Sequence, residues 1–258
     1  MSDTITIPEI GTPHPFAIET RGLTKQFDEM LAVDHLDLSV TAGTITGLLG
    51  GNGAGKTTTM SMLLGLLEPT DGTITMLGED MRHHRTRIAG QINFSSPYVD
   101  LPQRLTVRQN LVIYGLLYGV EDLKGKIAAL ADELQMTAML DRRYGSLSAG
   151  QKTRAALAKS LINQPRLLLL DEPTASLDPD TADWVRTLLL QYRDRTGATI
   201  FMASHNMVEV ERMCDDVVMM KQGRIVARGT PAALIATYGR DNLEEVFLDI
   251  ARNRSLHD

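Results

Sequence analysis

The sequence predicts an α/β fold in which a core of buried strands carries an antiparallel β subdomain and an inserted α-helical subdomain. Segments that are apolar almost throughout, at residues 166–172 and 199–203, indicate a central sheet covered on both faces. Residues 36–40 alternate between apolar and polar side chains after a first strand at residues 16–20, which favours an antiparallel pair. Residues 105–140 are mostly helical in pattern and interrupt the strand segments, with Thr106 as a possible cap and Leu111, Tyr114 and Leu117 along one face. Asp178 followed by Pro179 predicts the start of another helix, and Gln222-Gly223 predicts a hairpin turn.

Residues 50–57, Gly-Gly-Asn-Gly-Ala-Gly-Lys-Thr, fit the phosphate-loop pattern G-x-x-x-x-G-K-[ST] at every fixed position. A predicted strand at residues 44–49 precedes the loop and an apolar helical stripe that ends at residues 68–69 follows it, so an ordinary glycine turn is the weaker interpretation. The glycines let backbone N–H groups face phosphate oxygens beside the positive end of the helix dipole. Lys56 would add a cation, and Thr57 a hydroxyl for Mg²⁺. The candidate nucleotide-binding residues of this loop are Gly50, Gly51, Asn52, Gly53, Ala54, Gly55, Lys56, Thr57 and Thr58.

Two carboxylates end the buried strand at residues 166–172. Asp171 at such a position can bind Mg²⁺, and Glu172 can orient or deprotonate the attacking water. The next buried strand is followed by His205, which we therefore expect level with the acidic pair. A strand that simply ends in polar residues and a histidine that only closes a turn are the structural alternatives. The pattern favours a nucleotide-hydrolysing site with Glu172 and His205 as catalytic residues.

A second anion-binding segment, Leu-Ser-Ala-Gly-Gln at residues 147–151, precedes the acidic strand. Ser148 is predicted to cap a helix, so that a hydroxyl, glycine N–H groups and a helix dipole converge at one exposed end. This segment resembles the LSGGQ signature of ATP-binding cassette (ABC) proteins, with Ala149 in place of the first glycine. Together with the phosphate loop and the acidic strand end, the resemblance covers residues 16–238.

The resemblance implies a P-loop NTPase (RecA-like) core that uses ATP and Mg²⁺. In the ABC family two subunits form a head-to-tail dimer, in which the signature of one closes over the ATP of the other. Ser148, Gly150 and Gln151 would therefore contact the nucleotide of a second subunit, and Asp178 matches the loop that crosses between subunits. The other implied roles are adenine stacking by Phe27, contact of Lys56 with the β- and γ-phosphates, Mg²⁺ coordination by Thr57 and Asp171, general-base catalysis by Glu172, and contact of His205 with the γ-phosphate.

Two positions leave alternatives open. Phe27 lies in a predicted polar turn at residues 23–27, where its ring could stack on a base or enter the core. The family usually has a glutamine after the strand that here ends at Phe94, whereas this chain has Ser-Ser-Pro-Tyr at residues 95–98. Ser96 is the best candidate for the equivalent, and its shorter side chain would reach Mg²⁺ through water. We expect ATPase activity to be retained and its coupling to a membrane partner to be altered.

Composition bears on partners and location. The net charge of −6 gives no basic footprint for nucleic acid, so no nucleic-acid partner is expected. The longest apolar run outside the core strands, residues 111–120, is too short to cross a bilayer, so a membrane-spanning partner would be a separate chain. Residues 1–15 lack a signal-peptide pattern and Cys214 is the single cysteine, which agrees with a cytoplasmic protein. The basic segment at residues 82–87 is expected to be a solvated surface and not a metal site.

The expected organisation is an irregular tail at residues 1–15, an ABC ATPase domain at 16–238 with a helical subdomain at about 96–162, and a C-terminal helix and tail at 239–258. We expect the ATP-hydrolysing subunit of an ABC membrane transporter, of the exporter type paired with ABC-2-like permeases. Its partners would be a second copy of the chain and separate permease subunits at the inner face of the cell membrane. The alternatives are a soluble ABC ATPase that acts as a mechanical module outside transport, and a regulatory protein that binds ATP and barely hydrolyses it.

Overall fold

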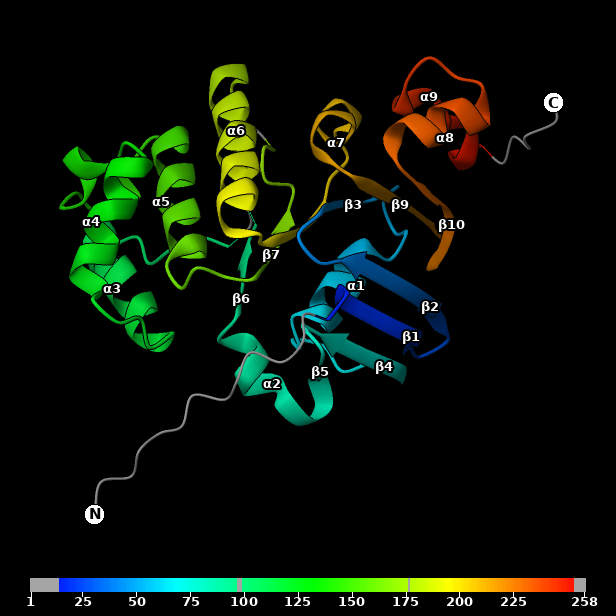
Figure 1. The fold of residues 1–258 in the computed structure, drawn as a ribbon, viewed down its shortest axis with the longest axis horizontal. Helices are drawn as coiled ribbons and strands as arrows, with labels where there is room; N and C mark the ends of the chain where they lie inside the picture. The colour runs from blue at the N-terminus through cyan, green and yellow to red at the C-terminus, as the bar shows by residue number, and fades with distance from the viewer. Residues whose placement is uncertain (1–13, 97–98, 176, 253–258) are drawn as a thin grey trace.

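Two β-sheets and the helices around them form the fold (Figure 1). The computed structural model describes residues 14–96, 99–175 and 177–252, so residues 1–13 and 253–258 of the predicted terminal segments, together with Pro97, Tyr98 and Ser176, lie outside the described residues. Within these ranges the larger sheet has six strands in the order β10-β9-β3-β8-β7-β6, and only β10 pairs antiparallel with its neighbour. Its strands are β3 (Ile45–Gly50), β6 (Ile92–Ser95), β7 (Leu167–Asp171), β8 (Thr199–Ala203), β9 (Asp216–Lys221) and β10 (Arg224–Gly229).

Side chains along the central strands alternate between two hydrophobic cores. On β7, Leu168 and Leu170 belong to one core, whereas Leu167 and Leu169 belong to the other, as the two-residue period of a strand requires. The first core is completed by helices, and the second by the smaller sheet and the helix after β3. The prediction of a central sheet covered on both faces is therefore confirmed.

The smaller sheet is antiparallel and has the strand order β2-β1-β4-β5. Its strands are β1 (Phe16–Phe27), β2 (Met30–Thr41), β4 (Asp71–Met76) and β5 (Glu79–Asp80). The predicted polar turn at residues 23–27 is wrong, because β1 continues through this segment and pairs Phe27 with Met30. The turn falls instead at Asp28, whose φ of +48° lies in the left-handed region that reverses the chain.

A helical subdomain lies to one side of the larger sheet, farthest from the antiparallel sheet (Figure 1). Thr106 caps its first helix in a reciprocal capping box with Gln109, as the sequence suggested. The predicted apolar face of that helix is partly wrong: Leu111 is buried, but the side chain of Leu117 is 75% exposed. The buried face runs instead through Gly115, which packs closely against Leu123. The helices are α3 (Val107–Leu117), α4 (Leu123–Glu133) and α5 (Ala149–Leu161).

Helix α1 (Lys56–Leu63) follows the phosphate loop and ends four residues before the predicted position, because Gly65 adopts a left-handed φ of +66°. Helix α2 (Met81–Ala89) carries the basic segment at residues 82–87, which is exposed as predicted. Helix α6 (Pro179–Thr196) begins after Asp178, whose carboxylate caps it. Local capping and glycine signals thus decide where these helices begin and end.

The last part of the chain packs back on the core. The β9–β10 hairpin turns at Gln222-Gly223, as predicted, and both turn residues have positive φ. Asn242 caps the final helix, which contacts α7 and α8, so this helix belongs to the fold itself. These helices are α7 (Met207–Met213), α8 (Pro231–Tyr238) and α9 (Leu243–Ala251). None of the helices in the described ranges has the length and apolar character that spanning a bilayer requires.

Candidate functional site

The phosphate loop connects β3 to α1, and two of its glycines lie where no side chain fits. A Cβ atom on Gly50 would come within 2.7 Å of the carbonyl oxygen of Met220. A Cβ atom on Gly55 would come within 2.6 Å of the carbonyl oxygen of Ala32, and Gly55 has a φ of +103° that favours glycine. Residues 51–53 are exposed, so the middle of the loop is open to a ligand.

The ammonium group of Lys56 lies between the loop and the acidic end of β7. Its Nζ donates hydrogen bonds to the carbonyl oxygens of Gly50 (2.5 Å) and Gly51 (3.3 Å). Burial lowers the pKa of this ammonium group, while the charges of Glu172 and Asp171 act in the opposite direction. A phosphate chain placed on the loop would therefore meet the cation that the two carboxylates already attract.

Asp171, the predicted Mg²⁺ ligand, is the last residue of β7. Burial and the charge of Glu172 raise its pKa, whereas Lys56 and a hydrogen bond with Ser96 lower it. Ser96, the predicted counterpart of the family's glutamine, is thus buried against Asp171, the predicted Mg²⁺ ligand. One carboxylate and the hydroxyls of Ser96 and Thr57 fit Mg²⁺, which binds few protein ligands and completes its shell with phosphates and water. In the described ranges no cluster of three His, Cys, Asp or Glu residues could hold a metal.

Glu172 and His205 form a close pair above the ends of β7 and β8. The Nδ1 atom of His205 lies 2.6 Å from Oε2 of Glu172, and the backbone N–H of His205 donates to the same oxygen at 3.3 Å. The imidazole is 72% exposed, whereas the carboxylate is only 14% exposed. The prediction that His205 lies level with the acidic pair is therefore correct in geometry, and the histidine has room to turn toward a ligand.

The Leu-Ser-Ala-Gly-Gln segment forms the exposed beginning of α5. Ser148 Oγ accepts from the N–H of Gln151 (3.4 Å), and the Gln151 side chain accepts from the N–H of Ser148 (3.2 Å), which completes a capping box. Gly150 faces Thr181 of α6, since a Cβ atom there would lie 3.4 Å from the Thr181 hydroxyl. Figure 1 shows α5 beside α6, apart from α1. Within one chain the two predicted anion-binding helix ends therefore lie apart.

Asp178 lies beside the same end of α5. Its carboxylate accepts hydrogen bonds from the N–H (3.0 Å) and the hydroxyl (2.7 Å) of Thr181, and these bonds lower its pKa. Because Thr181 also faces Gly150, the predicted crossing loop and the signature segment form one continuous surface. Sequence reasoning placed Asp178 as a helix cap, and the structure confirms that local role.

Phe27 ends β1 with its side chain 41% exposed, and Lys25 Nζ lies 5.1 Å from the ring centroid. The ring is therefore not part of the core, which leaves stacking as the better interpretation of this residue. The neighbouring strand β2 reaches the phosphate loop, where the Ala32 carbonyl oxygen lies against Gly55. Phe27 and the loop are thus carried by adjoining strands.

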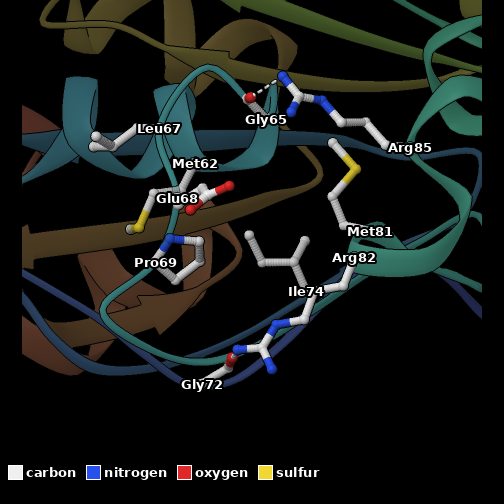
Figure 2. Close-up of a pocket in the computed structure, with 10 residues that line it drawn as sticks. All are labelled: Met62, Gly65, Leu67, Glu68, Pro69, Gly72, Ile74, Met81, Arg82 and Arg85. Carbon is white, nitrogen blue, oxygen red and sulfur yellow. Dashed lines mark hydrogen bonds between the residues drawn. The ribbon is translucent and has the colours of Figure 1, made fainter.

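A cavity of about 370 Å³ lies away from these residues, between the end of α1, β4 and α2 (Figure 2). Arg82 reaches across to donate to the carbonyl oxygen of Gly72 at 2.8 Å, and Arg85 hydrogen-bonds the carbonyl oxygen of Gly65 (Figure 2). These bonds satisfy backbone groups at the two ends of the cavity and give both side chains a structural role. None of the predicted site residues lines this cavity.

Sequence reasoning missed three buried polar residues beneath the Glu172–His205 pair. Glu209 of α7 is 1% exposed and accepts hydrogen bonds from the hydroxyls of Thr174 and Ser204. Its helix is short and was not predicted, so nothing in the local pattern marked the position as buried. The available signal was that Glu209 lies three residues after Asn206, which caps the helix. A carboxylate at that position is equally typical of an exposed first helical turn, so the signal did not indicate burial.

Comparison with known proteins agrees with this geometry. The family model described as "ABC transporter" matches residues 33–175. The Nod factor export ATP-binding protein I of Rhizobium sp. (strain N33) is 40% identical over 236 residues, which cover 90% of this chain and 76% of the relative. The protein of the same name from Burkholderia lata is 40% identical over 226 residues, with coverages of 84% and 72%.

Solved structures show the same fold. The ATP-binding subunit of an ABC transporter superposes with a TM-score of 0.84 at 24% identity, covering 91% of this chain and 99% of that one. The protein cbiO1 from Clostridium perfringens, described as part of the ABC transporter complex cbiONQ, gives a TM-score of 0.78 at 25% identity with coverages of 93% and 96%. The chain belongs to the ABC transporter family. It is an ATP-binding subunit of that family, which hydrolyses ATP to drive transport.

Proposed function

We propose that this chain powers export through membrane-spanning subunits that are separate chains, and that it works at the cytoplasmic face of the membrane. The observation that carries the proposal is the 40% identity over 90% of the chain to a protein named for Nod factor export. The proposal places the energy source in this chain and the choice of cargo in the permease. Co-purification of the tagged chain with a multispanning protein tests it, and recovery of the chain without such a partner would favour a soluble mechanical ATPase.

In the proposed reaction, ATP binds with its phosphates on residues 50–58 and its adenine against Phe27. Mg²⁺, held by Thr57 and Asp171 and reached by Ser96 through water, would neutralise charge on the β- and γ-phosphate oxygens. Lys56 contacts the same oxygens from the protein side.

Glu172 then orients the attacking water and accepts its proton as the bond to the γ-phosphorus forms and ADP leaves. His205 turns from Glu172 toward the γ-phosphate and so frees the carboxylate oxygen for the water. The Glu172–His205 distance of 2.6 Å supports this exchange, because the imidazole now lies directly against the carboxylate oxygen that would have to face the water.

We propose that two copies of the chain form a head-to-tail homodimer around two ATP molecules. Ser148, Gly150 and Gln151 of one copy complete the site on the other, and Asp178 lies at the crossing. Exposure of the α5 end and its distance from α1 support this arrangement (Figure 1). Glu172→Gln should form a stable dimer with MgATP in size-exclusion chromatography, and the additional change Ser148→Arg should return it to the monomer. A dimer that survives Ser148→Arg would contradict the composite site.

An exposed apolar surface on the helical subdomain supports docking of the permease. It comprises Ile113, Leu116 and Leu117, which lie within about one turn of each other on α3 and whose exposed fractions range from 45% to 75%. Such a cluster on a surface is typical of an interaction site. Leu116→Asp should abolish co-purification with the permease while ATP affinity stays unchanged. Equal recovery of the permease with Leu116→Asp would exclude this surface.

A further inference from the structure

A buried carboxylate lies directly beneath the Glu172–His205 pair. Glu209 on α7 is 1% exposed. The Thr174 hydroxyl donates to its Oε1 at 2.8 Å, and the Ser204 hydroxyl donates to its Oε2 at 3.0 Å. Thr174 and Ser204 are themselves buried, with 8% and 0% exposure. Each oxygen of one carboxylate therefore holds a different turn of the chain.

The two turns are the ones that carry the proposed catalytic residues. Thr174 follows Glu172 after β7, and Ser204 directly precedes His205 after β8. The Ser204 oxygen also accepts a hydrogen bond from the N–H of Asn206 (3.1 Å), which leaves its proton for Glu209. Glu209 thus fixes the separation between the turn that carries Glu172 and the turn that carries His205.

Glu172 needs such support because its backbone is strained. Its φ of +51° lies in the left-handed region, which a residue with a side chain adopts only when its surroundings impose it. Its N–H donates to the carbonyl oxygen of Ala203 (2.8 Å), and its own carbonyl accepts from Ala175 (3.1 Å). These bonds tie Glu172 to the end of β8 and to the turn that contains Thr174.

Filling a core position does not account for a carboxylate at residue 209. Burial raises the pKa of Glu209, and the two hydroxyl donors and the charge of Arg186 only partly oppose this effect. In the described ranges no lysine or arginine lies within ion-pair distance of it. A buried carboxylate without a paired cation is costly, and an apolar side chain would fill the same space at lower cost.

We propose that Glu209 is a positioning residue for ATP hydrolysis, which holds the turns of Glu172 and His205 at the spacing that their exchange requires. It acts through Thr174 and Ser204 and does not touch the nucleotide. The inference rests on the proposed roles of Glu172 and His205. It predicts that changes at Glu209 or Thr174 reduce turnover while the phosphate loop still binds ATP.

The test uses the full-length chain and compares Glu209→Gln with Glu211→Gln on the same helix. The amide keeps the volume of Glu209, but its NH₂ group cannot accept the second hydroxyl bond. We expect kcat per bound ATP to fall roughly 10- to 100-fold, with the Kd for MgATP within about twofold of the wild-type value. Glu211 is exposed, so Glu211→Gln should keep both constants.

Thr174 provides an independent pair of variants that does not alter the buried charge. Thr174→Val removes the hydroxyl at almost constant volume and should lower kcat, whereas Thr174→Ser keeps the hydroxyl and should restore it. A role in folding alone predicts instead that the melting temperature falls while kcat per bound ATP stays constant. That result, or wild-type kcat in both Glu209→Gln and Thr174→Val, would overturn the inference.

Glu172→Gln, measured in parallel, separates this inference from the function on which it rests. Loss of turnover in Glu172→Gln together with normal turnover in Glu209→Gln overturns the role of Glu209 alone. Normal turnover in Glu172→Gln overturns both the general base and its positioning. Loss of turnover in both, with intact ATP affinity in Glu209→Gln, supports the inference.

Discussion

The ammonium group of Lys159 lies 2.9 Å from the carbonyl oxygen of Phe94 and donates a hydrogen bond to it. Lys159 belongs to α5, which begins with the signature segment, and Phe94 lies two residues before Ser96. The same ammonium group lies 5.2 Å from the centroid of the Tyr114 ring on α3. One side chain therefore connects two helices of the helical subdomain to the strand that leads to the proposed metal site.

The burial of Lys159 predicts that the stability of the fold depends on pH. Burial lowers the pKa of Lys159 to about 8, below its ordinary value near 10.5. Between these values the unfolded chain binds more protons than the folded chain, so this group makes the free energy of unfolding rise with pH. Below a pH of about 8 Lys159 is charged in the folded and in the unfolded chain, so the full free-energy cost of burying its charge reduces the stability of the fold.

The comparison that checks this prediction is between the wild type and Lys159→Met. Thermal unfolding is followed by circular dichroism from about pH 7.5 to about pH 9.5, which covers the lower part of the interval between the two pKa values. Over this range the wild type should gain stability relative to Lys159→Met. Lys124→Met, at an exposed position of α4, should behave like the wild type. A difference between wild type and Lys159→Met that stays constant over this range would contradict the assigned cause.

Lys56→Ala should weaken ATP binding. The ammonium group already lies against the loop carbonyls of Gly50 and Gly51, where a phosphate chain would replace these contacts. Loss of charge-assisted hydrogen bonds corresponds to roughly a 10- to 100-fold increase in the Kd for ATP. Isothermal titration calorimetry measures it, with Lys124→Ala as the control, and an unchanged Kd would remove Lys56 from the nucleotide site.

Ser96 should tune coupling more than basal hydrolysis. A glutamine at this position extends beyond the Ser96 hydroxyl that bonds Asp171, so Ser96→Gln should raise the permease-stimulated ATPase rate by about twofold or more while basal activity persists. The rates are compared in membrane vesicles with and without the permease, and Ser95→Gln serves as the neighbouring control. A stimulated rate equal to that of the wild type would mean that Ser96 does not occupy the coupling position.

Gly55→Ala should destabilise the fold even without ATP. The new methyl group would meet the Ala32 carbonyl oxygen at 2.6 Å, and alanine disfavours a φ of +103°. We expect a loss of about 2 kcal/mol in the free energy of unfolding. Gly90→Ala is the matched control, since Gly90 has an ordinary helical φ of −66° and its nearest neighbour would lie at 3.6 Å. Equal urea midpoints for the two variants would argue against the close approach.

Features that depend on a few neighbouring residues could be predicted from the sequence. The Ser148 and Asp178 caps and the Gln222-Gly223 turn are each decided by local hydrogen bonds or by φ, and all three form as expected. The buried strands that end at Asp171 and Ala203 were also recognisable, because an apolar run of that length can be buried on both faces.

Features that depend on contacts between distant segments could not be predicted. Phe27 continues a strand because β2 pairs with it, and Leu117 is exposed because α4 packs at Gly115 instead. Glu209 carries no local sign of burial, since the hydroxyls that hold it come from two turns elsewhere in the chain. Tertiary pairing overrides local pattern in each of these cases.

Because the backbone of Glu172 is left-handed, the residue that would favour thermal stability at position 172 differs from the residue that ATP turnover requires there. Glycine adopts a φ of +51° freely, so Glu172→Gly would release roughly 1–3 kcal/mol of backbone strain at the expense of the proposed general base. A library of this chain selected only for survival at high temperature would therefore accumulate glycine at residue 172 and lose its ATPase. Selection that also demands transport would keep glutamate there and find its stabilising changes elsewhere.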